Sequence, residues 1–464
     1  MEATFVVIFV AVQLGYLGAS LTVLWLLSRP VNLVPRAGVA EATGDSPEII
    51  LFYPVLREAE ETMRTTFTGM RRAPYPAGLL RVISIPNADD HETIASLRRL
   101  QDEFNFLEVL AVPPTSDPSW ERVWSSWNDH PGAYWWHEGR RAGVRDLPPK
   151  KTRQLIWAMY QVAPGNEDAL LSYIDADSVI PVDYWHTAAA GMTQYDVLQN
   201  TNITGNLRRT WASSFHGLDH IAWDSTLYRH MSADGKHPFY VLGKGLFFRF
   251  RDLIDAGGFH PWLTIEDPEI GMRLWTRGKR LGVVESPLVE EVPATWWGGV
   301  TQRKRWVAGF FQSMASPLRH MGMTCRQRWR ARLNLVPCLS LALNPIGLGL
   351  AVWATTRVVT DDDEFLPPIA LALGLVSIVL AVGLMLFLML RAWHASKPVL
   401  TGRDRVRYLL RVNPLFTMLY WLWWIIPLVK GFVMFLRDGG LVWERTEKID
   451  ANHQLIRADE VRAA

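Results

Sequence analysis

Acidic residues at two separate points of the chain have the types and spacing needed for cation and proton chemistry. Asp175 and Asp177 follow the apolar run 170–174, and the pair Glu266-Asp267 lies further along the chain. Two carboxylates separated by one residue can reach one cation together, and Mg2+ or Mn2+ prefers oxygen ligands. A carboxylate such as Asp267 is suited to take a proton from a hydroxyl group. These groups are the parts needed to move a phosphate-activated group.

A cationic and aromatic cluster follows at residues 302–306. Arg305 offers a planar fork that suits phosphate, and Trp306 offers a flat face that suits a sugar ring. The same run could instead form a basic edge at a bilayer surface, because charge runs are usually solvated faces.

Structural alternatives also exist for the acidic residues. Loop aspartates such as Asp175 and Asp177 often form turns or cap helices. Asp267-Pro268-Glu269 is typical of a helix start with Asp267 as the N-cap, which we expect to keep that carboxylate ionised. The histidines of the group His216, Asp219 and His220 are four residues apart, which could suggest zinc. The H-E-x-x-H pattern is absent and no third ligand is identifiable, so polar packing or acceptor contact is the better hypothesis.

Long uncharged stretches flank this chemistry. Hydrophobic residues make up 49% of the chain, and charged residues are absent from 3–27, 333–356, 365–390 and 414–429. The first three stretches exceed the roughly 20 residues that a helix needs to cross a bilayer, so we expect them to span. The first is too long for a secretory signal and no cleavage site follows, which favours a retained anchor. The fourth could span or re-enter, because its prolines and tryptophans also suit the interface.

The distribution of charge orients the chain and excludes some partners. Arg29 and Arg36 follow the first stretch and a basic loop follows the third, so the positive-inside rule places the middle region in the cytoplasm. A net charge of +2, without a nucleic-acid motif, indicates no nucleic-acid partner. The two cysteines, Cys325 and Cys338, lack metal-ligand spacing and fit a reducing compartment.

Short β-rich runs alternate with helical patterns in the middle region. The pattern predicts strands at 49–53, 80–85, 106–112 and 170–174, and helices at 58–69, 93–104 and 153–162. This rhythm predicts a mostly parallel, Rossmann-like α/β sheet with helices on both faces and ligands at the carboxyl ends of the strands. Residues 113–150, rich in proline and tryptophan, are expected to form a long irregular insertion that faces substrate or packs.

Hydropathy therefore predicts five parts. These are an anchor at 1–28, a cytoplasmic domain at 29–311, an amphipathic interfacial helix at 312–332, a membrane region at 333–436 and a tail at 437–464. The membrane region would contain two spans plus a third span or a re-entrant segment.

In this order the segments resemble the family 2 glycosyltransferases of GT-A fold, and more narrowly the membrane-integrated branch that contains cellulose, chitin and hyaluronan synthases. The likeness runs from about Ile49 to about Gln312 and is looser through the membrane segments and the tail motif 443–448. The resemblance implies that Asp175 and Asp177 hold the metal and that Asp267, next to Glu266, is the catalytic base. The Q-x-x-R-W motif, here Gln302, Arg305 and Trp306, would line the acceptor and diphosphate side.

The resemblance also implies a set of donor contacts. The segment 53–58 stands where the family first contacts the nucleotide, although Arg57 replaces the usual Asn. The position of the base-contacting aspartate is open between Asp89 and Asp90, with Asp89 preferred. The implied donor-binding residues are Tyr53, Pro54, Glu58, Asp89, Lys151, Asp175 and Gly243.

The implied activity is inverting, metal-dependent transfer of a hexose from a UDP- or GDP-sugar to a growing polysaccharide or glycolipid, with Mg2+ or Mn2+ and formation of a β-linkage. The enzyme would sit in a bacterial plasma membrane, in contact with lipid, as a homo-oligomer or with an accessory subunit. Addition of one sugar to a lipid acceptor is an alternative. A non-catalytic transport or scaffold protein is another, and a binding-only relative would be expected to lack one of the three aspartates Asp175, Asp177 and Asp267.

Overall fold

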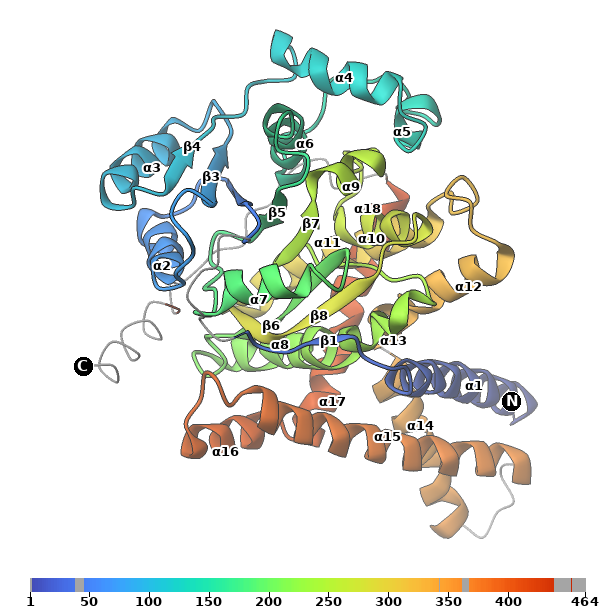
Figure 1. The fold of residues 1–464 in the computed structure, drawn as a ribbon. Coiled ribbons are helices and arrows are strands. Elements are labelled where there is room, and N and C mark those ends of the chain that lie inside the picture. Colours follow the sequence, from blue (N-terminus) through green and yellow to red (C-terminus); the bar gives the residue numbers. More distant parts are fainter. Residues whose placement is uncertain (1, 38–45, 342, 361–366, 438–451, 453–464) are drawn as a thin grey trace.

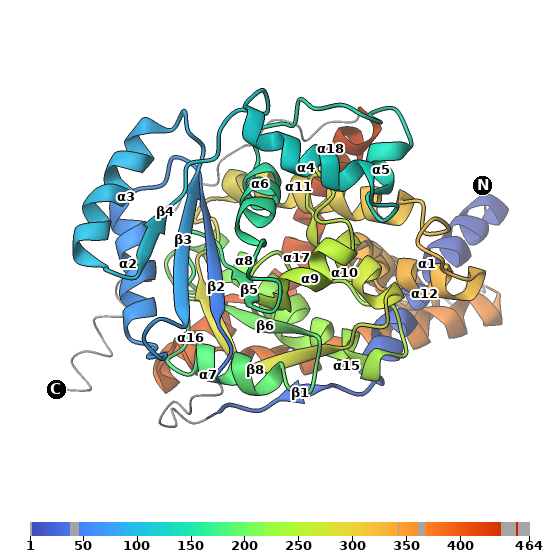
Figure 2. The ribbon, with the colours of Figure 1, turned by 45° about the horizontal axis from the view of Figure 1, so that its top comes forward.

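One eight-stranded sheet forms the centre of the protein. The computed structural model describes residues 2–37, 46–341, 343–360, 367–437 and 452, and the tail motif 443–448 lies outside them. The strands lie in the order β1-β8-β6-β7-β5-β2-β3-β4 (Figure 2). Their bounds are β1 Leu33–Val34, β2 Ile49–Val55, β3 Leu80–Pro86, β4 Leu107–Val109, β5 Leu170–Tyr173, β6 Val197–Thr204, β7 Leu246–Arg249 and β8 Leu281–Glu290. All pairs are parallel except those of β7, which runs antiparallel to β5 and β6.

The predicted strands and helices of the middle region are confirmed with small shifts of their ends. The helices here are α2 Glu60–Arg71, α3 His91–Glu103, α6 Lys151–Val162, α7 Tyr184–Gly191, α8 Trp211–Ala222, α9 Phe250–Asp255 and α10 Asp267–Thr276. The strand predicted at 106–112 is shorter and ends at Val109.

Burial on both faces explains why β2 carries no charge. Ile50 and Phe52 of β2 enter one hydrophobic cluster, and Leu51 and Tyr53 enter another. Successive side chains of a strand point to opposite faces, so helices must cover the sheet on both sides.

The insertion at 113–150 is not irregular throughout, and its tryptophans pack. It forms a turn of 3-10 helix at Pro118–Trp120, α4 Glu121–Asn128 and α5 Tyr134–His137. Trp120 and Trp136 stack on Trp124, with ring centroids 5.3 Å apart in both pairs. Trp124, Trp127 and Trp135 are buried as well, so the packing alternative describes this segment.

The helices outside the α/β region are α1 Glu2–Leu27, α11 Trp296–Ala315, α12 Cys325–Leu333, α13 Val336–Ser340, α14 Leu343–Thr360, α15 Pro368–Ala395, α16 Gly402–Arg411, α17 Pro414–Trp423 and α18 Ile425–Leu436. The helices α14 to α17 lie below the sheet, whereas α11, α12 and α18 lie beside it (Figure 1). Three helical segments are long and apolar enough to cross a membrane: 4–27, 368–395 and 414–436.

Two sequence expectations for the helices α11 to α14 are wrong. The stretch 333–356 is not one spanning helix, because it is divided among the end of α12, α13 and α14. Pro337 and Pro345 lie in the first turns of α13 and α14, and a proline there cannot continue a helix that precedes it. The segment 312–332 is not one interfacial helix either. The preceding helix α11 runs on to Ala315, and α12 begins only at Cys325.

The fourth apolar stretch is long enough to span but is interrupted at Trp424, between α17 and α18. Its second half packs against α11, where Phe311 contacts Phe432 and Phe435. A Cβ at Gly431 would lie 2.7 Å from the Lys304 carbonyl oxygen, so the two helices need a glycine at this crossing.

Candidate active site

The loop that follows β5 carries the Asp175-Ala176-Asp177 triplet and is fixed by hydrogen bonds from buried hydroxyl groups. The hydroxyl groups of Tyr53 and Thr66 both donate to the Ala176 carbonyl oxygen, at 2.7 and 2.8 Å. Tyr53 is fully buried on β2 and is not among the cavity-lining residues. It therefore supports the turn, whereas the sequence predicted a donor contact.

The two aspartates of the triplet have different surroundings. The Asp175 side chain is 40% exposed, and its Oδ1 lies 2.6 Å from Lys151 Nζ. Asp177 is buried, and its Oδ2 accepts a hydrogen bond of 2.9 Å from the backbone N–H of Glu291, just past β8. The Asn452 side chain donates to the Asp177 carbonyl oxygen at 2.8 Å. Asp177 is thus fixed by the strand end, and Asp175 is the more exposed of the two on the cavity wall.

A short relay of contacts joins this loop to Asp267. Lys151 Nζ donates to the Gly243 carbonyl oxygen at 2.5 Å, and the Gly243 N–H donates to Asp267 Oδ2 at 2.8 Å. Lys151 stands at the start of α6 and Asp267 at the start of α10. Three segments that are distant in the sequence therefore meet at Gly243.

These residues line one cavity of about 240 Å³. It contains all the predicted site residues except Tyr53 and Asp89: Pro54, Glu58, Lys151, Asp175, Asp177, Gly243, Glu266, Asp267, Gln302, Arg305 and Trp306. Asp89 is exposed, while Asp90 caps α3 through Thr93 N–H and accepts from Arg57 N–H at 2.7 Å. Because the Asp90 carboxylate is occupied by these two backbone groups, Asp89 remains the candidate for contact with the nucleotide base.

The electrostatics of Asp267 differ from the expectation. Helix α10 begins at Asp267 itself, with Glu266 at the N-cap position and Pro268 in the first turn. Burial, and then the neighbouring Glu266 charge, raise the pKa of Asp267 to about 8, and its own N–H, Lys151 and the Gly243 N–H only partly oppose this. A helix start was expected to keep the carboxylate ionised, but loss of solvation outweighs it.

Gln302, Arg305 and Trp306 lie on one face of α11, because residues three and four apart share a helix face. Arg303 points elsewhere and is fully buried, with Nη2 2.7 Å from Asp219 Oδ2. The hydroxyl of Tyr420 donates to the same oxygen at 2.5 Å. The basic run therefore divides into residues that line the cavity and a residue that ties α11 to α8.

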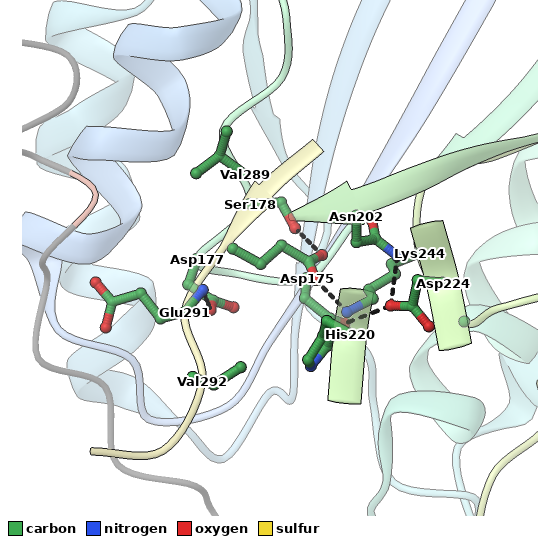
Figure 3. A network of polar contacts seen from close by, with 12 residues as sticks. Asp175, Asp177, Ser178, Asn202, His220, Asp224, Lys244, Val289, Glu291 and Val292 are labelled. Atoms are coloured by element: carbon green, nitrogen blue, oxygen red, sulfur yellow. Dashed lines mark hydrogen bonds and ion pairs between the residues drawn. The ribbon is translucent and has the colours of Figure 1, made fainter. Parts of the chain in front are cut away.

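Sequence reasoning did not assign a second polar group beside the aspartates, shown in Figure 3. Lys244 contacts Glu290, whose other oxygen accepts from Ser178 Oγ at 2.8 Å, and His220 Nδ1 lies 2.9 Å from Asp224 Oδ2. Burial alone would lower the pKa of Lys244, but the charges of Glu290, Asp224 and Asp175 raise it. The only sequence feature that pointed to Lys244 was its position between Gly243 and Gly245.

The histidines of α8 do not form a zinc site. His216 is buried and its Nδ1 lies 2.9 Å from the Pro293 carbonyl oxygen, which confirms polar packing. His220 lines the cavity together with Asp224. Within the described residues, no group of three or more His, Cys, Asp or Glu side chains is placed to hold a metal.

The donor set nevertheless fits a hard divalent cation bound together with a ligand. Asp175 and Asp177 offer carboxylate oxygens from one loop at the wall of the cavity. Mg2+ is commonly bound by one or two carboxylates, with phosphates and water completing its octahedron. Two protein ligands are therefore sufficient.

Comparison with known proteins places the chain in a family. Residues 170–436, more than half of the chain, match Glycosyl transferase family group 2, and the chain belongs to this family. A comparison with curated proteins by sequence gives no match.

The fold is that of the GT-A glycosyltransferases. Mannosyltransferase PcManGT from Pyrobaculum calidifontis, solved with GDP-Man and Mn2+, superposes with a TM-score of 0.53 at 17% identity, over 93% of this chain and 99% of that one. S. aureus TarS 1-349 with UDP-GlcNAc gives a TM-score of 0.36 at 10% identity, over 87% and 95% of the two chains.

Proposed function

We propose that this family 2 glycosyltransferase transfers a hexose from a nucleotide sugar to a hydroxyl group of a membrane-associated acceptor, with inversion and formation of a β-linkage. One observation carries the proposal. Asp267 lies in the same cavity as Asp175 and Asp177 and is joined to Asp175 through Gly243 and Lys151.

In this mechanism Asp267 takes the proton of the acceptor hydroxyl as the oxygen attacks the anomeric carbon. The bond to the nucleotide diphosphate breaks on the opposite face of the sugar, which inverts the configuration. Burial, and then the Glu266 charge, raise the pKa of Asp267, so its ionised form is a stronger base than an ordinary carboxylate.

The leaving diphosphate would lie beside Asp175 and Asp177. When bound there, Mg2+ or Mn2+ would neutralise charge that develops on the diphosphate, a role worth several kcal/mol. Lys151 and Lys244 add positive charge on the same side, and Arg305 offers a fork for phosphate oxygens. The similar mannosyltransferase was solved with GDP-Man and Mn2+, which supports a nucleotide-sugar donor and a divalent cation.

Part of the cavity wall is apolar and aromatic, with Trp306, Phe310 and Trp424 near the helices α17 and α18. An aromatic wall suits the sugar rings of a growing polysaccharide or glycolipid. Its position beside candidate membrane helices also favours the alternative, a lipid acceptor that receives one sugar. The length of the product separates these two reactions.

We propose a membrane location with the α/β region on the cytoplasmic face of a bacterial plasma membrane. Three candidate spans and the basic loop 391–411 support it. An odd number of spans would place the chain after α18 on the opposite face from the α/β region. Asn452, beyond α18, donates to the Asp177 carbonyl oxygen of that region, which favours re-entry of 414–436.

The proposal is tested with protein purified in detergent and a panel of UDP- and GDP-sugars, each with Mg2+ or Mn2+. Release of nucleotide that depends on one donor and one metal is the expected result. No release with any donor, or release that persists in Asp267→Asn, contradicts the proposed reaction and its base. A folded wild type without any release would favour the non-catalytic alternative.

A further inference from the structure

A second hollow, of about 260 Å³, lies away from the cavity at the corner between α11 and α12. The chain leaves α11 at Ala315 and enters α12 at Cys325, and the loop between them closes one side. The polar and aromatic lining comes from Ser316, Arg319, Cys325, Arg328, Trp329 and Arg332.

The positive charge of this hollow is not balanced by neighbouring carboxylates. In the part of the chain that the structure describes, Arg319, Arg328 and Arg332 form no ion pair, and Arg332 Nε donates to the Met314 carbonyl oxygen at 3.0 Å. The nearby pair is His320 with Glu138, at 3.0 Å. The sequence from 292 to 360 contains no Asp or Glu. Guanidinium forks that line a concave surface match the oxygens of a phosphate group.

Helix α12, which forms one wall of the hollow, ends beside the end of the first candidate span. Arg29 follows that span by two residues, and its Nη1 donates to Asn334 Oδ1 at 3.0 Å. Asn334 is the C-cap of α12, so α12 lies beside the end of α1 (Figure 1). Trp329, on the wall of the hollow, is 62% exposed. An exposed tryptophan among arginines, on a helix that ends beside a candidate span, is typical of the lipid headgroup region.

The walls of the hollow are held in place by a buried apolar cluster beneath them. Leu318, Met323 and Ala331 are buried in a cluster with Met272 of α10. This packing fixes the loop and α12 against the α/β region. The positive field at this corner is also felt by His237, since burial, and then Arg29 and Arg330, lower the pKa of His237 to about 4.

We propose that this hollow binds the phosphate headgroup of an anionic phospholipid. Arg319 and Arg328 would contact the phosphate oxygens, and Trp329 would lie at the boundary of the acyl chains. Basic clusters next to a membrane span attract anionic lipids in this way. The contact of α12 with the end of α1 favours a lipid headgroup over free phosphate as the ligand.

The test uses the full chain, purified in detergent and delipidated, with bound lipid counted by native mass spectrometry. Equal amounts of phosphatidylglycerol and phosphatidylcholine are offered, and inorganic phosphate is titrated separately. The wild type is expected to retain phosphatidylglycerol selectively. Arg319→Gln with Arg328→Gln should weaken this binding about tenfold or more, since each lost contact is a charge-assisted hydrogen bond. Arg332 is left in place because it also holds Met314.

The matched control is Arg403→Gln with Arg407→Gln, which removes the same charge from exposed positions on α16. It should keep the selectivity of the wild type. Equal retention of both lipids by the wild type overturns the proposal, and this result does not depend on any variant. Equal loss in the control pair also overturns it. If inorganic phosphate binds as tightly as phosphatidylglycerol, the hollow is a soluble-phosphate site and the lipid assignment is wrong.

Discussion

The N–H of Gly243 donates to Asp267 Oδ2 at 2.8 Å, so the glycine turn before β7 holds the carboxylate that we propose as the base. A Cβ at Gly243 would lie 3.4 Å from Asp267 Oδ2 and from Glu266 Oε1, which is ordinary contact. The position thus tolerates a methyl group in the fold, and that group would project toward the two carboxylates.

Gly243→Ala is therefore expected to fold normally but to raise KM for the nucleotide sugar or lower kcat. Gly245→Ala is the contrasting variant. Gly245 has φ +64°, and its Cβ would lie 2.5 Å from Leu288 Cδ1, so alanine there should lower the melting temperature. Steady-state kinetics and thermal unfolding separate the two effects. Equal melting temperatures for both variants would contradict this reading of the turn.

Asp267→Asn should reduce kcat by about 10²- to 10⁴-fold, the usual contribution of a general base. The folded pKa of Asp267 lies above the ordinary carboxyl value of about 4, so between these values the unfolded chain binds fewer protons. The free energy of unfolding then falls as pH rises from about 4 to about 8. The variant should lose this dependence and melt higher than the wild type at pH above 8. The control is Asp129→Asn, the same substitution at an aspartate that does not line the cavity.

The pH profile of the wild type should rise through the pKa of Asp267, because only the ionised carboxylate accepts a proton. Glu266 contributes negative charge that raises this pKa, so Glu266→Gln should move the midpoint of kcat/KM to lower pH. Initial rates between acidic and alkaline buffers, at saturating metal, measure both midpoints. A midpoint that stays fixed or moves upward in Glu266→Gln would rule out this electrostatic account.

Arg303 and Arg305 are two residues apart and should respond differently to the same substitution. Arg305→Gln should lower kcat/KM about 10- to 100-fold with little change in melting temperature, since Arg305 lines the cavity. Arg303→Gln should destabilise the fold by about 3–5 kcal/mol, because it leaves the buried Asp219 without its cation. Chemical unfolding and kinetics on both variants give the comparison. The reverse pattern would show that the two roles have been exchanged.

Arg57 occupies the left-handed backbone region with φ +51°, at the position where related enzymes were expected to have Asn. Asn tolerates this conformation better than other non-glycine residues. Arg57→Asn should therefore stabilise the protein by roughly 0.5–1 kcal/mol, and Arg57→Ala should not. Thermal unfolding decides it. A loss of stability in Arg57→Asn would mean that the Arg57 side chain contributes more than the backbone strain removes.

Local patterns in the sequence were sufficient for the elements of the first half of the α/β region, up to β5, and the family resemblance supplied most of the cavity residues. Runs such as 49–53 and 170–174 predict strands because buried residues and the absence of charge are local properties. Their shared register, with Ile49 opposite both Leu80 and Leu170, brings the carboxyl ends together, as parallel pairing requires. The acidic triplet could therefore be placed in advance, whereas the residues of α11 were assigned by the resemblance.

What the sequence alone determined is the set of chemical groups and their order along the chain. The tertiary structure decided which of them face one another. Tyr53 turned out to be a buried support, Arg303 a structural ion pair, and Lys244 a neighbour of Asp175 through Glu290. It also decided the protonation of Asp267, because a pKa depends on burial and on Glu266, Lys151 and Gly243 as they are assembled in space. Solvation and charge in a cavity arise from contacts between distant segments, and no local pattern records them.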